Sequence, residues 1–540
     1  MIVLLRCFFL FLTCFISLTA GEMGVVVSAS TPWTDPKGYT PVIITIQSPN
    51  DTAINLRTQS NKSSASVSLF ARAGESINYT LLLPPTTAGF LYTRSVEWDT
   101  RSGASGEAHI SSHGSSRDVR GYVIDPTESF DLVGLNKLIK GSATSDKFAR
   151  LNVATLPDRW QGYPTWLTLV LTEQGQAALN DSQLTAIATW ASAGGTLAVT
   201  SSTQANFWLR RFIKTPVVGS SDKKHAVLSE LHALHNNHDN WEPRIAPVVG
   251  TETVPVKTFV VLAIVFALVV GPLNMWWVRR RKARYLFLVT TPALSLATCL
   301  ILIIASLIAD GIDTKRGAVQ LVLIDQSAQQ SIRWTGCSYF ASFASTQVQL
   351  DAQAKMLIFD SNDRHRHRYN NDDRNALHVV WQNGQRITGS IIPARVHRQL
   401  GYVEALPERR RVEIHRSKDG WRVNNGLGVS LSSFRWTDPQ GAHWQCNAVP
   451  TGEQSDLTLA SVAMKEGVPK SIPAQELSKE LNERIGSEAW LAWDRIKKQP
   501  FCYVAVADQP LDPLPGPSAI DSDVPLIYVA GIAAPIGDAP

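Results

Sequence analysis

Two long stretches without a charged residue lie near the middle of this 540-residue chain. They cover residues 258–278 and 285–309, and the short connection between them, 279–284, carries five cations. At about 1.5 Å per residue, a helix of either length crosses the ~30 Å hydrocarbon core of a bilayer. Because the connection is short, the two helices must run antiparallel. The sequence therefore predicts a hairpin of two transmembrane helices.

The cations of the connection set the predicted orientation of this hairpin. They are Arg279, Arg280, Arg281, Lys282 and Arg284. Loops rich in Lys and Arg remain on the cytoplasmic side of a membrane. We therefore expect the chain to lie in a bacterial cytoplasmic membrane, with the lipid bilayer as a partner and with its N- and C-terminal regions extracytoplasmic, in the periplasm.

The N-terminus has the layout of a secretory signal peptide. Within residues 1–20, Arg6 is followed by an apolar run from Cys7 to Leu18 and then by small residues. The run is short for a spanning helix, which favours a signal peptide, and an uncleaved anchor is the alternative. Export would place Cys337, Cys446 and Cys502 in an oxidising compartment, where either two of them pair or all three are buried thiols.

Residues 22–118 have the pattern of short strands and turns. Runs rich in β-branched residues, such as 41–48 and 76–83, are separated by segments rich in Pro, Asn and Asp, and no long helical period occurs. This pattern is typical of a β-sandwich.

Strands and helices alternate in residues 119–250, which indicates a parallel sheet covered by helices. Residues 121–125, 149–155, 166–171 and 196–200 are the expected strands. A helix is expected at 182–193, with Ser182 as its N-cap and Gly194 as its C-terminal stop.

The segment 179–199 (LNDSQLTAIATWASAGGTLAV) resembles the helix-to-strand segment of class I glutamine-amidotransferase-like domains. The hairpin, with Gly271-Pro272-Leu273-Asn274 before its basic turn, is similar to that of bacterial membrane proteins of unknown function that carry such a domain outside the membrane. Active class I amidotransferases use a cysteine nucleophile, and this chain has no cysteine between Cys14 and Cys299. The resemblance therefore implies a degenerate domain.

The region 318–540 is again rich in strands, with one expected helix at 474–496. The expected strands include 318–324, 355–359, 376–381, 411–415, 502–507 and 526–532. The expected fold class is thus a multidomain α+β membrane protein: an N-terminal β-sandwich, an amidotransferase-like α/β domain, two transmembrane helices and a C-terminal β-rich region.

Few residues point to catalysis or to metal binding. No Gly-x-Ser-x-Gly sequence occurs, which argues against a standard serine hydrolase. Asp125, at the end of a predicted strand, and the nearby Glu128 are weak candidates for acid–base catalysis. His232, His235 and His238 have spacing that allows a metal site, although no carboxylate or thiol completes a known ligand signature. Trp160 and Trp208 are candidates to flank a ligand groove at the carboxyl ends of the sheet.

These observations favour a non-enzymatic, membrane-anchored cell-envelope protein that binds other envelope proteins or a wall component, with no cofactor. An extracytoplasmic hydrolase or carbohydrate-active enzyme that works through carboxylates is one alternative, and a subunit of a transport or secretion complex is another. The net charge of +5 is small for this length, and no nucleic-acid-binding motif occurs, so we expect no nucleic-acid partner.

Overall fold

Strands dominate the computed structural model of the protein. Within its described residues the strands form three sheets, of ten, four and thirteen strands. The structure describes residues 24–536 apart from 36–37, 61–62, 86–94, 113–118, 129, 134–135, 137–146, 165–166, 200–255, 282–285, 311–313, 360–375, 418–419, 461–484, 486, 498, 518–519 and 522–524.

The ten-stranded sheet starts with the N-terminal strands. Side chains alternate between buried and more exposed positions along Ser63–Ala71, as expected of a strand with one face on a core. The N-terminal members of the sheet are β1 (Val26–Thr31), β2 (Thr40–Gln47), β3 (Thr52–Ser60), β4 (Ser63–Ala71), β5 (Ser76–Leu83), β6 (Ser95–Thr100) and β7 (Ser105–Ser112).

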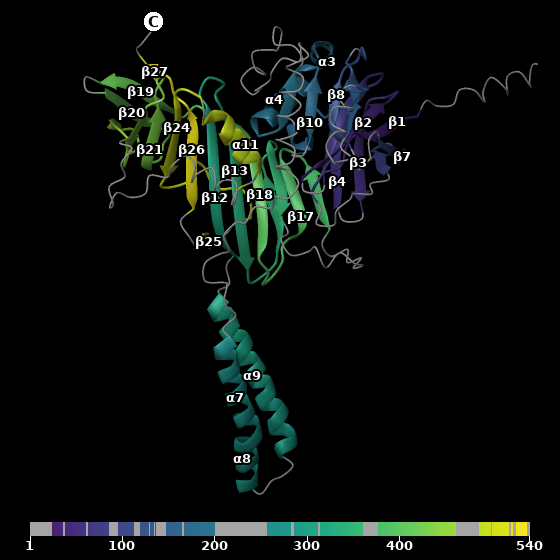
Figure 1. Cartoon of the computed structure of the whole chain (residues 1–540). Helices are drawn as coiled ribbons and strands as arrows, with labels where there is room; N and C mark the ends of the chain where they lie inside the picture. The colour runs from purple at the N-terminus through teal and green to yellow at the C-terminus, as the bar shows by residue number, and fades with distance from the viewer. Residues whose placement is uncertain are drawn as a thin grey trace, which may run out of the picture.

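Three strands from a much later part of the chain complete this sheet. They are β14 (Ser345–Leu350), β16 (Leu377–Trp381) and β17 (Gln385–Ile392). Strand β16 pairs in parallel with β4, and Leu377 lies beside Ser63. The two sets of strands also share one hydrophobic core. Figure 1 shows this sheet beside the rest of the β-rich body.

The four-stranded sheet is parallel throughout, in the order β11-β10-β8-β9. Its strands are β8 (Val119–Ile124), β9 (Lys147–Arg150), β10 (Thr168–Leu171) and β11 (Thr196–Val199), with helices α3 (Glu173–Ala178) and α4 (Asp181–Ser192) and the short 3₁₀ helices η1 (Val153–Thr155) and η2 (Trp160–Gly162). Strand β9 lies on one side of β8, and the chain then returns to form β10 on the other side. The strand order therefore reverses beside β8.

The N-cap of helix α4 lies two positions before the residue that the sequence predicted. The N-cap is Asn180, whose side chain accepts from the backbone of Gln183, while the Gln183 side chain accepts from the backbone of Asn180. The predicted cap Ser182 lies inside the first turn instead, because this reciprocal pair is a stronger N-terminal signal. Gly194 follows the helix with a φ of 108°, as a C-terminal glycine should.

The thirteen-stranded sheet occupies the C-terminal part of the chain. Helix α11 (Ser487–Ile496) covers it, and Trp493 packs in one core with Trp190 of α4 and Trp334 of β13. Its strands are β12 (Thr314–Asp325), β13 (Gln330–Ala341), β15 (Ala354–Phe359), β18 (Arg398–Pro407), β19 (Arg411–Ser417), β20 (Gly420–Gly426), β21 (Leu431–Thr437), β22 (His443–Cys446), β23 (Gln454–Leu459), β24 (Cys502–Ala507), β25 (Ile520–Asp521), β26 (Leu526–Ile532) and β27 (Pro535–Ile536).

A helical hairpin projects from this body (Figure 1). One arm consists of α7 (Val256–Leu268), a π-helical turn η3 (Val269–Leu273) and α8 (Asn274–Arg280), and the other is α9 (Leu286–Asp310). Pro272 lies in the π-helical turn, where it cannot donate a backbone hydrogen bond. The Asn274 amide donates across the hairpin to Thr291 Oγ1 at 3.2 Å.

The transmembrane helices predicted at 258–278 and 285–309 are corrected by the structure. Within the described residues, no helix has both the length and the apolar character needed to cross a membrane. In place of one continuous first helix, α7 ends after 13 residues and the π-helical turn at Pro272 follows. The predicted location in a cytoplasmic membrane rested on these helices and is wrong with them.

The predicted fold class is also wrong. The described chain is mostly β, and its four-stranded sheet does not form the separate amidotransferase-like α/β domain that we expected. One face of that sheet buries its apolar side chains in the same core as strands β12, β13 and β18 and helix α11, while Val123, Val170 and Ala198 form a separate small cluster. Tertiary packing therefore joins segments that the sequence pattern alone separates.

Candidate functional site

Asp125 follows β8 at the carboxyl edge of the parallel sheet, where the strand order reverses and where α/β sheets commonly bind ligands. Its carboxylate is buried and accepts hydrogen bonds from Thr127 Oγ1 at 2.9 Å and from the Phe130 backbone N–H at 2.7 Å. A third donor, Thr172 Oγ1, lies 3.4 Å away at the end of β10. These contacts hold the loop that follows β8.

The charge state of Asp125 fits this structural role. Burial acts to raise its pKa, but the donors from Phe130 and Thr127 and the charge of Arg150 outweigh burial, and the pKa lies below its ordinary value. Asp125 is therefore ionised at neutral pH and is unsuited to act as a general acid.

Glu128 belongs to the same loop but faces solvent, with 76% of its side chain exposed. Its Oε2 atom accepts from Arg150 Nη1 at 3.0 Å, and Arg150 Nη2 donates to the carbonyl oxygens of Glu128 and Phe130, both at 2.9 Å. The structure thus brings Asp125 and Glu128 into one loop but engages each with separate partners, Asp125 mainly with Thr127 and Phe130 and Glu128 with Arg150 at the end of β9. We see in them a strand-to-loop junction rather than a catalytic pair.

Four of the other sequence candidates are not described by the structure. His232, His235, His238 and Trp208 lie outside the described residues. Among the described residues, no group of three or more His, Cys, Asp or Glu side chains is placed to hold a metal ion.

The structure describes three of the five basic residues of the hairpin turn and all three cysteines of the C-terminal region. Arg280 and Arg281 lie over the rings of Trp276 and Trp277, and Arg279 lies in the last turn of α8. Lys282 and Arg284 are outside the described residues. Cys337, Cys446 and Cys502 form no disulfide with one another, and burial raises the pKa of Cys446 to about 11 and that of Cys502 to about 12.

A groove that the sequence did not indicate lies where three parts of the chain meet, and we call it the junction groove. It has a volume of about 570 Å³. It is lined by Tyr79 of β5, by the segment 158–161 around η2, by the first turns of α4, by Ala352 and Gln353, and by the β16–β17 turn. A second hollow of about 560 Å³ adjoins it and shares Tyr79, Asp158 and Ser182.

Planar groups form the floor of the junction groove. The Arg159 guanidinium lies over the rings of Tyr79 and Trp381, with its Cζ atom 4.8 and 4.9 Å from the two ring centroids, and it donates to Tyr79 Oη at 2.8 Å. Trp160 is buried beneath, and its indole N–H donates to Gln353 Oε1 at 3.2 Å. Cation–π contacts of this kind fix the guanidinium as part of a flat surface.

Polar side chains form the rim. Exposed carboxylates, hydroxyls and carboxamides surround the floor, namely those of Asp158, Asp181, Ser182, Thr185, Gln353, Gln382 and Asn383. Such groups offer several hydrogen-bond donors and acceptors at short range. The lining includes two carboxylates and one guanidinium, so the groove suits a polar ligand better than a strongly charged one.

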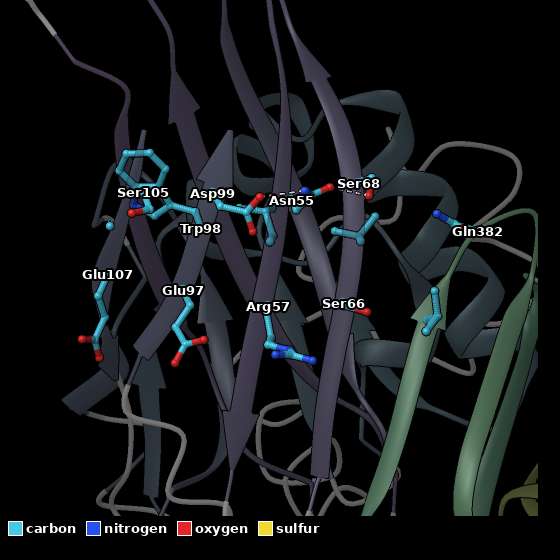
Figure 2. A pocket seen from close by; sticks show the side chains of 14 residues that line it. Asn55, Arg57, Ser66, Ser68, Glu97, Trp98, Asp99, Ser105, Glu107 and Gln382 are labelled. Carbon is cyan, nitrogen blue, oxygen red and sulfur yellow. Dashed lines mark hydrogen bonds between the residues drawn. The ribbon is translucent and has the colours of Figure 1, made fainter. Parts of the chain in front are cut away.

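Figure 2 shows another hollow, of about 670 Å³, on the outer face of the ten-stranded sheet. Its side chains form rows across the strands. In one row Ser68 Oγ donates to Asn55 Oδ1 at 2.7 Å and the Asn55 amide donates to Asp99 Oδ1 at 2.8 Å. In the next row Arg57 lies opposite Glu97, which lies opposite Glu107. The first row satisfies its polar groups internally, so this open face is the weaker candidate.

Trp160 is the groove residue that the sequence had made a candidate for ligand binding. The Trp381-Gln382-Asn383-Gly384 turn is a recognisable hairpin signal, yet nothing local places it beside residues 158–161. Comparison with known proteins adds no assignment, since no family model and no curated protein matches the chain.

Proposed function

We propose that the protein is a non-enzymatic binding protein whose junction groove holds a carbohydrate chain. The observation that carries this proposal is the convergence of carboxamides, hydroxyls and carboxylates above a flat floor of aromatic rings and a guanidinium. Sugar hydroxyls require several donors and acceptors at once, and sugar rings present a C–H face that packs on planar groups.

The shape of the groove supports this ligand class over a protein partner. A volume of about 570 Å³ with an adjoining hollow of about 560 Å³ has the scale of a small-ligand site. A carbohydrate chain of a few rings would occupy both hollows, which meet at Tyr79, Asp158 and Ser182.

The carboxylates of the groove support binding over hydrolysis. Asp158 and Asp181 are both exposed to solvent. Glycosidases need one carboxyl group whose pKa is raised, commonly by burial, so that it can protonate the leaving group. Asp158 and Asp181 are not buried in this way, and the buried Asp125 is ionised and lies in a different loop.

Calorimetric titration of the full-length chain with soluble β-linked oligosaccharides, including those built from N-acetylated amino sugars, tests the proposal. We expect saturable binding that Thr185→Trp weakens at least tenfold, because Thr185 is exposed on α4 and a tryptophan there would fill the groove. Ser68→Trp is the matched control on the outer sheet face of Figure 2 and should leave binding unchanged.

Two results would overturn the proposal. Binding that is lost in Ser68→Trp and kept in Thr185→Trp would move the site to the outer sheet face, and the absence of binding to every oligosaccharide would remove it. Release of shorter sugars during the titration, detected by chromatography, would refute the non-enzymatic assignment.

A further inference from the structure

A second cavity, separate from the junction groove, lies beside the C-terminal half of α11. Its volume is about 550 Å³. Most of its wall is apolar. Ile496 at the end of α11 contributes to it, together with residues from strands distant in sequence, namely Ile324, Ile332, Val412, Ile532 and Ile536. Ile532 and Ile536 remain 37% and 50% exposed. A cavity of this volume, whose mostly apolar wall also carries polar and charged side chains, has the usual character of a small-molecule site.

One cationic side chain in the wall, Arg495, forms no salt bridge with a carboxylate among the residues that the structure describes. Arg495 Nη1 donates to the Ala191 carbonyl at 2.7 Å and Nη2 to the Gly195 carbonyl at 2.8 Å. The adjacent Asp494 pairs with Lys497 at 2.7 Å. Burial lowers the pKa of Arg495 to about 10, and Asp494 opposes that shift only in part. The guanidinium is thus a partly desolvated charge, which an anion within reach would stabilise.

The other charged groups of the cavity wall are already engaged. Asp325 accepts from the backbone N–H groups of Ser327 and Ala328, both at 3.0 Å, within its own turn. Glu413 Oε1 pairs with Arg411 at 2.6 Å. Their charges are satisfied locally, so Arg495 is the group in the wall whose charge an incoming ligand can still compensate.

We propose that this cavity binds a carboxylate with an unbranched apolar tail, of the medium-chain fatty-acid class, with the tail among the isoleucines and the carboxylate at Arg495. The tail gains from leaving water at about 25 cal/mol per Å² of buried apolar surface. The carboxylate forms charge-assisted hydrogen bonds with the guanidinium N–H groups that do not donate to the carbonyl oxygens of Ala191 and Gly195. This site is independent of the proposed carbohydrate groove.

Titration of the full-length chain with dodecanoate and with dodecanol, both below their aggregation concentrations, tests the proposal. We expect dodecanoate to bind at least tenfold more tightly than dodecanol. In Arg495→Met this preference should fall to below twofold while dodecanol binding is kept. Ala534→Phe, at an exposed position of the cavity wall, should weaken both ligands at least tenfold without unfolding the chain.

Because Arg495 also holds α11 to the end of α4, a second variant separates charge from folding. Arg495→Lys keeps a cation and should retain at least part of the dodecanoate preference. Arg386→Met, at an exposed position of β17 outside the cavity wall, is the matched control that should bind as the unaltered chain does. The proposal fails if neither ligand binds, if both bind equally well, or if Ala534→Phe leaves binding intact.

Discussion

Lys355 and Asp35 form a buried ion pair where three parts of the chain meet. The two side chains are each only 2% exposed, and Lys355 Nζ lies 3.9 Å from Asp35 Oδ2. Nζ also donates to the carbonyl oxygen of Tyr163 at 2.9 Å. Asp35 precedes β2, Tyr163 follows η2, and Lys355 is in β15, so one ammonium group connects the N-terminal strands, the parallel-sheet segment and the C-terminal region.

Replacement of Lys355 by methionine removes the charge and keeps most of the side-chain volume. The main cost is then the Asp35 carboxylate left in the interior without its cation, which for buried pairs amounts to about 3–5 kcal/mol of unfolding free energy. The loss of the hydrogen bond to Tyr163 is part of this figure. With a urea dependence of about 3 kcal/mol per molar, the midpoint of unfolding should fall by about 1 to 1.7 M.

Urea unfolding followed by tryptophan fluorescence measures this change. Trp33, Trp160 and Trp190 lie in the shared core near the pair, so their emission reports on the junction. The double variant Lys355→Met with Asp35→Asn should recover at least half of the loss, because it leaves no unpaired charge. Lys497→Met, which breaks a more exposed pair, should cost less than 1 kcal/mol.

The reasoning is refuted if Lys355→Met costs less than 1 kcal/mol, since the pair would then contribute no more than a surface pair. It is also refuted if the double variant is less stable than Lys355→Met alone, because the cost would then come from lost packing rather than from an isolated charge.

Two further predictions concern the sheets. Burial raises the pKa of Glu404 on β18 to about 7 despite the nearby Arg333. The contribution of Glu404 to stability should therefore be fully present below pH 4.5 and should fall by up to about 3 kcal/mol as the pH rises to about 7. Glu404→Gln should remove this part of the pH dependence, which denaturant midpoints across this range would measure. Gly175→Ala in α3 should lower the melting temperature, because the added Cβ would lie 2.1 Å from the Ile124 carbonyl oxygen. Alanine normally stabilises a helix by about 1 kcal/mol over glycine, so a gain in stability would contradict that contact.

Local patterns in the sequence identified many individual strands correctly. The expected strands at 355–359, 411–415, 502–507 and 526–532 correspond to β15, β19, β24 and β26. Strand β9 is shorter than expected, because the chain turns into the 3₁₀ helix η1 after Arg150. β-branched and aromatic residues with a period of two carry this information within each segment.

The pairing of distant segments could not be predicted in the same way. Nothing in Leu377–Trp381 indicates that it pairs with Ser63–Ala71 rather than with a nearer strand. The junction groove depends on that pairing, because Trp381 and its turn reach Arg159 only once β16 lies beside β4. Conversely, Asp125 was visible in the sequence as a carboxylate after a strand, but its backbone donors were not.

The pairing of β16 with β4 also determines when the N-terminal sheet can be completed during synthesis. His378 and Ser64, which are neighbours across these strands, are separated by 314 positions in the chain. At about 5–20 residues per second, the ribosome needs roughly 15 to 60 s to supply the second strand after the first. Throughout that interval β4 presents an unpaired edge to other nascent chains, a well-known route to aggregation. A chain arrested before residue 377 would keep that edge open permanently.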